Sequence, residues 1–552
     1  MIQEVIIQDL FMQKLLLLGD EAIAQGAMDS GLSGMYAYPG TPSTEIMEYI
    51  QSSGEAAERD IHRSWSANEK TALEAALGMS YAGKRAMVAM KHVGLNVAAD
   101  PFINSAVTGI NGGLIVVAAD DPSMHSSQNE QDSRFYGKFS FVPVYEPSNQ
   151  QEAYDMVSDA FKLSEEYRIP VLFRITTRLA HSRAPVERKV QEPENTFHLP
   201  SDPRQFVLLP AIARKKYKAL LAIYESLKYD KKIAGYNLLS NGKNNKLGII
   251  ACGIAYNYLV ENFQEKNPDF PVLKISAYPF PKELIGRLSG SCEEVLVLEE
   301  GYPYVEESLR GILDDRLKIL GRLDGTIPRD GELNPSLVAA AIGLTQETVL
   351  KVPDIVKSRP PSFCKGCGHS DTFNAVIEAL RPFKSNGVFS DIGCYTLGAL
   401  PPYSIITSCV DMGASVTMAI GASDAGLHPS VAVIGDSTFT HSGMTGLLDA
   451  VLKNSSVTII ISDNSTTGMT GGQKSHATGR LRSICEGIGV AHEHVRTIIP
   501  LRKNHEENVR IMLEEFNYRG VSVIISEREC IQTATGRKKS EISDSKNKEV
   551  GK

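Results

Sequence analysis

The sequence has no run of apolar residues long enough to cross a membrane and no excess of positive charge. A membrane-spanning helix needs about 20 consecutive apolar residues, and none of the 552 residues fall in such a run. The first ten residues, MIQEVIIQDL, carry acids where a signal peptide carries basic residues. The net charge of -8 provides no general attraction for nucleic acid. We therefore expect a cytoplasmic protein that binds neither membranes nor nucleic acid.

Cysteine is also scarce, with 8 residues in the whole chain. Without a secretory leader, so few cysteines in so long a chain indicate thiol or metal chemistry and argue against a disulfide framework. The chain is long enough for three ordinary domains, and it contains no short tandem repeat.

Apolar segments alternate with helical patterns along most of the chain, which predicts an α/β fold of parallel sheets covered by helices. Between residues 15 and 190 the expected strands are LLLLG, MYAYPG, RAMVAMKH, GLIVVAADD and IPVLFRI. We expect a first domain at 1–195, a polar connector at 196–245, a middle α/β domain at 246–350 and a last domain at 351–535. The charged tail at 536–552 lacks aromatic residues and is predicted to be disordered.

The segment from Val431 to Gln473 carries the strongest local pattern. One apolar run ends at Gly435-Asp436-Ser437, and a second, after a helical pattern, ends at Asp463-Asn464. Adjacent parallel strands bring their carboxyl ends to one crevice, so the Asp436 carboxylate and the Asn464 amide can meet there. Oxygen ligands suit Mg²⁺, and a diphosphate would supply more of them. The alternative is an ordinary strand-end turn of an α/β protein.

The Gly-Asp-Ser and Asp-Asn pair, separated by 25 residues, resembles the thiamine diphosphate motif, which is usually written GDG and NN. The departures are Ser437 and Asp463, and both leave the expected ligands in place. The resemblance implies that Mg²⁺ is bound by Asp436, Asn464 and the main-chain oxygen of Thr466. It further implies that the cofactor contacts Ile392, Gly393, Cys394, Tyr395, Gly435, Asp436, Ser437, Asn464, Met469 and Thr470.

A second motif, Cys364-Lys-Gly-Cys367-Gly-His369, has the Cys-x₂-Cys spacing of a metal site. Zinc with His369 as a third ligand, a redox dithiol and an iron–sulfur cluster all remain open from the residues alone. Cys394 and Cys530 are the candidates that complete four sulfurs. Four thiolates suit either zinc or a [4Fe–4S] cluster.

These motifs together resemble the 2-oxoacid:ferredoxin oxidoreductases, and within them the large subunits of the indolepyruvate:ferredoxin type. The resemblance spans about residues 15 to 535 and rests on YPGTPSTEI, WSANEK, MKHVGLNVAADP, ADDPSMHSSQNEQDSR, CKGCGH, DIGCYTLG, GDSTFTHSG and DNSTTGMTGGQ. It implies thiamine diphosphate-binding folds in the first and last domains and a [4Fe–4S] cluster on Cys364, Cys367, Cys394 and Cys530. It also implies coenzyme A as co-substrate and a hetero-oligomer with a small β subunit.

One feature departs from the family. Its large subunits usually end in a ferredoxin-like segment, whereas here no cysteine follows Cys530. We therefore expect a ferredoxin or a separate ferredoxin-like subunit as a partner.

Glu69 follows Ser-Ala-Asn at the start of an Ala-rich helical pattern. By resemblance it is the carboxylate that holds N1′ of the aminopyrimidine, although a helix-start carboxylate would also fit there. Thr41, His92 and His125 are further catalytic candidates, and Asn96 and Gln128 are substrate candidates, all in turns at the expected sheet edge. The histidines could instead be structural.

The implied reaction is oxidative decarboxylation of a 2-oxoacid, an arylpyruvate by resemblance, to an acyl-coenzyme A. The alternatives are a non-oxidative thiamine diphosphate-dependent decarboxylase or acyl transferase, and an inactive subunit that binds the cofactor without turnover.

Overall fold

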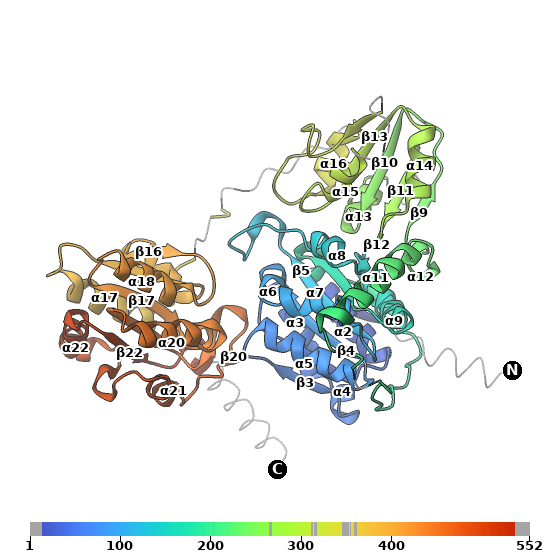
Figure 1. Ribbon diagram of the computed structural model, residues 1–552. Helices are drawn as coiled ribbons and strands as arrows, with labels where there is room; N and C mark the ends of the chain where they lie inside the picture. The colour runs from blue at the N-terminus through green and yellow to red at the C-terminus, as the bar shows by residue number, and fades with distance from the viewer. Residues whose placement is uncertain are drawn as a thin grey trace, which may run out of the picture. The chain divides into compact units, whose positions relative to one another are not determined.

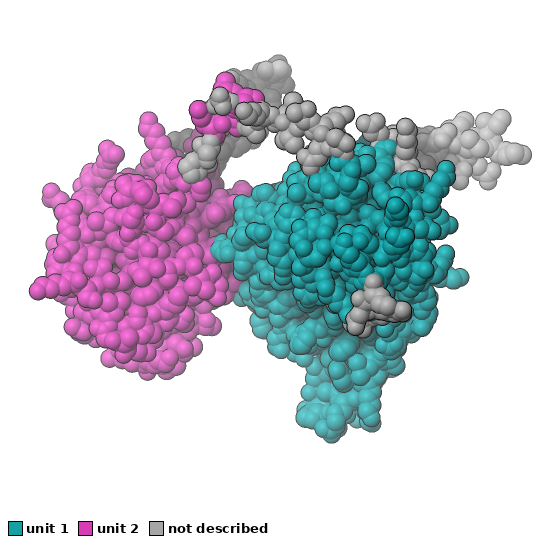
Figure 2. All heavy atoms as spheres, turned by 90° about the horizontal axis from the view of Figure 1, so that it is seen from above, with its two compact units in different colours: residues 1–351 teal, residues 352–552 magenta. Residues whose placement is uncertain are grey.

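The computed structural model describes residues 14–202, 204–263, 268–310, 313, 317–344, 353, 355–357 and 361–535. The predicted disordered tail, 536–552, lies outside the described residues. The chain forms two compact units, residues 1–351 and 352–552 (Figure 2). Within the described ranges, every helix is too short or too polar to span a membrane.

The first sheet of unit 1 has seven strands in the order β12-β6-β7-β5-β4-β2-β3. Their bounds are Ala277–Tyr278, Val144–Tyr145, Val171–Thr176, Leu114–Asp120, Ala86–Lys91, Gly34–Ala37 and His62–Trp65. Figure 1 labels β3, β4, β5 and β12 of this sheet. The central strands β4 and β5, AMVAMK and LIVVAAD, are buried almost throughout. Such unbroken apolar runs are typical of parallel strands that are covered on both faces.

Helices pack against this sheet and against one another. Contacts between α2, α3 and α9 form one helical layer, and contacts among α5, α6 and α7 form another. The helices of this part are α2 (Gly19–Asp29), α3 (Thr44–Ser52), α4 (Gly54–Glu58), α5 (Glu69–Tyr81), α6 (His92–Val97), α7 (Ala99–Thr108), α8 (Arg134–Ser140), α9 (Gln150–Tyr167) and α10 (Thr177–His181).

Two strand pairings in and beside the first sheet depart from the predicted parallel pattern. The LLLL segment, β1 (Lys14–Leu18), does not join the large sheet but pairs antiparallel with β8 (Arg183–Glu187). At the other end, β12 enters from the middle of the chain and pairs antiparallel with β6. Both pairings join segments distant in sequence, which local apolar patterns do not specify.

A second sheet of unit 1 has the order β14-β13-β10-β11-β9, with β9 antiparallel. Its strands are β9 (Leu238–Ser240), β10 (Leu247–Cys252), β11 (Val272–Ile275), β13 (Glu294–Leu298) and β14 (Lys318–Leu320), and its helices are α13 (Ile254–Glu261), α14 (Lys282–Ser291), α15 (Tyr304–Leu309) and α16 (Pro335–Ala341). The expected connector contains α11 (Pro210–Leu227), α12 (Lys231–Ala234) and β9.

Unit 2 is built on a six-stranded parallel sheet in the order β16-β15-β17-β18-β22-β21. One apolar cluster packs α18, α20 and α21 on it, and a second packs α17 and α22. The strands are β15 (Gly387–Ser390), β16 (Ile406–Cys409), β17 (Ser430–Gly435), β18 (Val457–Asp463), β21 (Val495–Ile498) and β22 (Val521–Glu527), and the helices are α17 (Gly368–Leu380), α18 (Ala414–Asp424), α20 (Met444–Lys453), α21 (Leu481–Ile488) and α22 (His505–Asn517). The predicted class, parallel sheets covered by helices, is confirmed.

Candidate functional site

The two predicted strand-end turns of unit 2 lie side by side. Strands β17 and β18 are parallel neighbours, with Gly435 opposite Ser462. Asp436 begins a helical run that continues through the π-helical turn Phe439–Gly443 into α20. The carboxylate therefore stands where the free N–H groups of a helix start meet the carboxyl edge of the sheet, an arrangement that favours a bound anion.

The Asp436 carboxylate is buried, and its Oδ2 atom has no hydrogen-bond partner within the described part of the chain. Burial, followed by repulsion from Asp463, raises its pKa to about 7. A buried carboxylate with an unused oxygen is costly unless a positive charge neutralises it. The residues present thus fit a cation such as Mg²⁺ at this point.

Asn464 and Thr466 form the turn after β18. The Thr466 N–H donates to the Asn464 Oδ1 atom at 3.1 Å, and Thr466 begins the short strand β19 (Thr466–Thr467), which pairs with β20 (Gln473–Lys474). The Ser437 Oγ atom lies 2.9 Å from the Thr467 Oγ1 atom. Met469 and Thr470 follow in the same loop; Met469 is exposed, and Thr470 donates to Gln473 Oε1 at 2.7 Å.

The Tyr395 ring packs against the glycines of two segments expected to contact the cofactor. A Cβ atom on Gly393 would lie 2.3 Å from the Tyr395 ring, and one on Gly435 would lie 2.7 Å from it. The Tyr395 hydroxyl donates to Asp391 and to the Ile392 carbonyl oxygen, the latter at 3.0 Å. Close packing against Tyr395 thus requires glycine at both positions. Asp391, which the motif analysis did not select, orients this ring.

The four candidate cysteines converge on one cavity of about 110 Å³ in unit 2, which also borders Asn464. The Cys530 N–H donates to the Asn464 carbonyl oxygen at 3.2 Å. A Cβ atom on Gly468 would lie 3.6 Å from the Cys394 Sγ atom. Burial and the neighbouring thiols raise the pKa of Cys394 to about 11. The sulfurs therefore stand directly beside the loop expected to bind the diphosphate.

The spacing of these sulfurs bears on the metal they would hold. In a tetrahedral zinc site the Zn–S distance of about 2.3 Å places sulfurs roughly 3.8 Å apart. Among the residues that the structure describes, no three of the candidate Cys and His ligand atoms lie within 4.8 Å of one another. His369 is buried, and its Nδ1 atom lies 3.2 Å from the Cys367 Sγ atom. Zinc and an iron–sulfur cluster therefore both remain candidates for these ligands.

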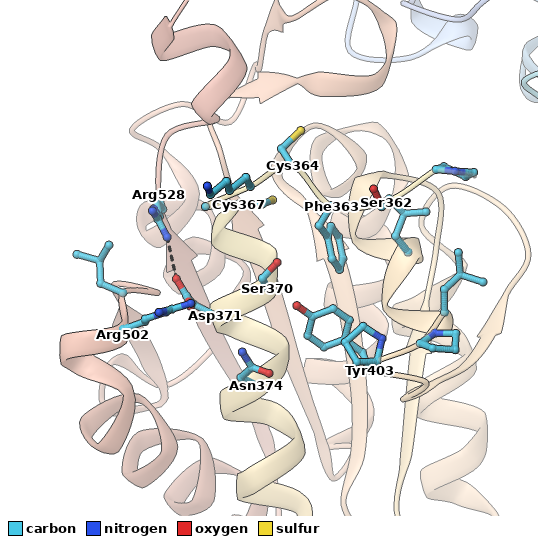
Figure 3. Close-up of a pocket in the computed structure, with 18 of the residues that line it drawn as sticks. Ser362, Phe363, Cys364, Cys367, Ser370, Asp371, Asn374, Tyr403, Arg502 and Arg528 are labelled. Carbon is cyan, nitrogen blue, oxygen red and sulfur yellow. Dashed lines mark hydrogen bonds and ion pairs between the residues drawn. The ribbon is translucent and has the colours of Figure 1, made fainter. Parts of the chain in front are cut away.

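A wider pocket of about 1070 Å³ opens beside Cys364 and Cys367 (Figure 3). Phe363 and Tyr403 contribute aromatic surface to it, and Ser370 and Asn374 project from α17 (Figure 3). Its basic residues are Lys365, Arg502, Lys503 and Arg528, of which Arg528 pairs with Asp371 at 2.9 Å.

Glu69 is the first residue of α5 and is buried. A Cβ atom on Gly94 would lie 2.6 Å from the Glu69 Oε1 atom, so α6 lies against the carboxylate only because residue 94 is glycine. Lys91, at the end of β4, was missed by the sequence analysis. Burial lowers its pKa to about 8, and the negative charges of Asp121 and Glu69 oppose that shift.

Thr41 and His92 lie at the same carboxyl edge of the first sheet. The Thr41 carbonyl oxygen accepts a hydrogen bond from Ser126 Oγ at 3.1 Å. The Ser126 carbonyl oxygen in turn accepts one from Lys91 Nζ at 2.6 Å. His92 is buried, with Nε2 3.2 Å from the Asn129 carbonyl oxygen. Its Nδ1 atom has no partner among the described residues.

The remaining candidates are more exposed. His125 lies 3.6 Å from Glu332, which Arg178 also binds. Asn96 accepts a hydrogen bond from Tyr136 at 2.7 Å, and Gln128 is exposed. Ser43, the residue before α3, makes no side-chain cap bond and instead donates to the Gly40 carbonyl oxygen at 2.7 Å.

Comparisons with known proteins agree with this geometry. Residues 25–218 match the family described as "Pyruvate flavodoxin/ferredoxin oxidoreductase, thiamine diP-bdg", and residues 391–498 match "Thiamine pyrophosphate enzyme, C-terminal TPP binding domain". The indolepyruvate oxidoreductase subunit IorA of Archaeoglobus fulgidus is 39% identical over 95% of this chain and 88% of its own length. The IorA subunit of Pyrococcus horikoshii is 37% identical over 96% and 87%.

The chain belongs to the IorA family of oxidoreductase subunits. The predicted family is thereby confirmed, and so is a thiamine diphosphate-binding domain in each unit. The chain is a subunit of a thiamine diphosphate-dependent oxidoreductase of the 2-oxoacid:ferredoxin oxidoreductase superfamily. A solved structure, 2-oxoglutarate:ferredoxin oxidoreductase from Magnetococcus marinus, is similar at a TM-score of 0.49 and 16% identity over 60% of this chain and 65% of that chain.

Proposed function

We propose that this chain oxidatively decarboxylates an arylpyruvate such as indolepyruvate and passes two electrons, one at a time, through a [4Fe–4S] cluster to ferredoxin. The carboxyl group leaves as carbon dioxide, and the acyl carbon forms a thioester with coenzyme A, whose thiol proton is released. The relatives' printed names support the substrate. The observation that carries the electron path is the cavity where four cysteines border Asn464.

Thiamine diphosphate supplies the carbanion chemistry when it is bound. Asp436 and Asn464, with the main chain of Thr466, would hold the Mg²⁺ that neutralises the diphosphate. The helical run that starts at Asp436 presents N–H groups to the same anion. Gly393 and Gly435 let Tyr395 pack beneath the loop, which fixes the loop's position.

In unit 1 we assign Glu69 to N1′ of the aminopyrimidine, where it would stabilise the protonated ring nitrogen. Gly94 of α6 lies against this carboxylate, and Glu69 is buried, which limits the access of water to it. Thr41 and His92 are assigned to the substrate end of the same sheet edge. His125 would reach substrate only on leaving Glu332, so we rank it below His92.

The pocket beside Cys364 fits the exit of the electrons. Lys365, Arg502 and Lys503 line it, with no ion pair to any of them among the described residues. A positive rim steers an acidic carrier toward the cysteines and orients it. A ferredoxin or ferredoxin-like subunit is a carrier of this kind.

The four cysteines provide the decisive test. Anaerobically purified protein should be brown and contain about four irons and four sulfides per chain. Cys364→Ala and Cys367→Ala should each remove the colour and stop reduction of ferredoxin. Cys252→Ala is the matched control, because Cys252 is fully buried in the second sheet of unit 1 and should affect packing alone.

Cys530→Ala decides the fourth ligand. If that variant keeps a full cluster by iron analysis and electron paramagnetic resonance, the fourth ligand lies elsewhere. A colourless wild-type protein with stoichiometric zinc would contradict the proposal that the cysteines bind an electron-transfer cluster. The remaining function would then be that of a non-oxidative decarboxylase.

A further inference from the structure

Three side chains that could bind a metal lie together in unit 1, apart from the residues assigned above. They are Asp20 from α2, Glu45 from α3 and His181 from α10. One ligand atom of each lies within 4.8 Å of those of the other two. α10 is distant in sequence from α2 and α3, so the fold and not a local motif creates this group.

Asp20 is the strongest indication of a ligand. Its side chain has no exposed surface, and neither carboxylate oxygen has a hydrogen-bond partner within the described ranges. Burial and then the charges of Glu45 and Glu21 raise its pKa well above the usual value. Glu21 itself is occupied, since the Leu18 N–H and Arg183 both bind it. Asp20 lies in the first turn of α2, whose positive end partly offsets its charge.

Glu45 and His181 form the outer side of the group. The His181 Nε2 atom lies 3.4 Å from the Glu45 Oε1 atom, and the two side chains are 35% and 34% exposed. The Glu45 Oε2 atom is buried and has no partner among the described residues. Solvent can therefore reach the group from the side of Glu45 and His181, while Asp20 closes it from within.

We propose that Asp20, Glu45 and His181 bind one divalent first-row cation of the Zn²⁺ class. An imidazole nitrogen and two carboxylate oxygens are a ligand set that zinc accepts, with water in the fourth position. Two carboxylates and a neutral imidazole balance the charge of the cation. The metal would replace the missing partner of Asp20, which a water molecule could not neutralise.

Such an ion would connect the segments that shape the sheet edge. α3 begins directly after the turn that contains Thr41, and α10 begins at Thr177, which donates to Asp121 at 2.7 Å. Asp121 in turn accepts from the Ser126 N–H at 2.8 Å. Fixing α2, α3 and α10 to one another therefore stabilises both turns, so the expected role of the metal is structural.

The test counts metal on the full-length protein. Wild type, Asp20→Asn, Glu45→Gln and His181→Ala are treated with chelator, dialysed against Co²⁺ and analysed for bound cobalt and its visible d–d absorption. We expect each variant to bind one Co²⁺ fewer per chain than wild type. His62→Ala is the control, since His62 is an exposed histidine of unit 1 whose ring contacts Ser64; it should bind as wild type does. The cysteines and Asp436 are common to all samples and cancel in the difference.

Two outcomes overturn the proposal. If Asp20→Asn and His181→Ala bind as much Co²⁺ as wild type, Asp20 instead carries a proton that it shares with Glu45. The same conclusion follows if Co²⁺ raises the melting temperature of wild type and of Asp20→Asn equally. Circular dichroism identifies a variant that fails to fold, in which case Glu45→Gln supplies the answer. Iron content and thiamine diphosphate affinity should stay unchanged in Asp20→Asn, which separates this site from the proposed function.

Discussion

Buried carboxylates are neutralised in one region of the molecule and left without a partner in another. Where the two sheets of unit 1 meet, Arg174 lies 2.6 Å from Asp120 and also binds Glu146, while Arg134 binds Asp132 at 2.9 Å. At the carboxyl edge of unit 2, by contrast, one oxygen of Asp436 meets no donor among the described residues.

This difference in partners distinguishes carboxylates that are part of the structural core from carboxylates that can bind a ligand. A buried carboxylate with a fixed arginine is stable when every lone pair is used, whereas removal of one partner is strongly destabilising. Asp436 has no such arginine, so its charge must be balanced by a proton or by a bound cation. The comparison therefore predicts opposite behaviour when members of the two regions are changed.

Replacing Asp436 should have the largest effect. Asp436→Ala removes the only anionic side chain among the assigned Mg²⁺ ligands, and we expect Mg²⁺-dependent binding of thiamine diphosphate to be lost. Isothermal titration calorimetry measures the affinity for thiamine diphosphate in the presence of Mg²⁺, and Cys252→Ala serves as a folded control. Unchanged affinity would mean that Asp436 is an ordinary strand-end acid and that the comparison fails.

Glu69→Gln should leave the cofactor bound while turnover falls about 10²–10⁴-fold, the usual contribution of a positioned proton-transfer group. A neutral amide has nearly the same shape but cannot stabilise a protonated ring nitrogen. Calorimetry and steady-state rates separate the two effects. Wild-type turnover in this variant would reduce Glu69 to a helix-start carboxylate.

Arg174→Met should destabilise unit 1 by about 3–5 kcal/mol, because it leaves Asp120 and Glu146 buried without their partner. The denaturant midpoint of the apo-protein measures this loss of folding stability. Arg204→Met is the control, since Arg204 and its partner Asp202 are 75% and 52% exposed; it should cost no more than about 1 kcal/mol. Equal losses in the two variants would show that the buried network is no stronger than a surface pair.

The sequence predicts features whose information is local. Asp436 and Asn464 stand in short motifs at the ends of apolar runs, and strands β17 and β18 lie where these runs predict them. Cys364 and Cys367 stand in a local Cys-x₂-Cys motif just before α17. The glycine at position 94 also has a local signal, because MKHVGLNV places it one helical turn from the strand end, but its contact with Glu69 requires the packing of α5 on α6.

Pairings between distant segments could not be predicted. The β12–β6 pair, the β1–β8 pair and the Arg134–Glu299 contact at 2.9 Å each join residues whose sequence neighbours carry no matching signal. The group of Asp20, Glu45 and His181 is hidden for the same reason. Only the folded chain brings one acid from each of two helices to a histidine at the end of a third.

Replacing Lys91 should change the folding stability least, and in the opposite direction from Arg174→Met. Its folded pKa of about 8 is below the ordinary value of 10.5, because burial disfavours the charge. Between pH 8 and 10.5 the unfolded chain therefore binds more protons than the folded one. The loss of folding stability caused by burying the charged Lys91 is fully present below this range and shrinks as the pH rises through it. Lys91→Met should then stabilise the chain at pH 7 by on the order of 2 kcal/mol, since one pKa unit corresponds to about 1.4 kcal/mol and solvent screening reduces the total.

The pH profile makes this prediction sharp. The gain in the denaturant midpoint of Lys91→Met over wild type should be constant from pH 6 to 7.5 and should vanish toward about pH 10.5. Lys70→Met is the control, because Lys70 is an exposed lysine paired with Glu74 on α5 and should change stability little at any pH. Turnover should fall in Lys91→Met, since its charge lies near Glu69 and Asp121. A loss of stability at pH 7 would instead show that Lys91 is a paired structural cation like Arg174, and the contrast between neutralised and unneutralised buried charge would not extend to it.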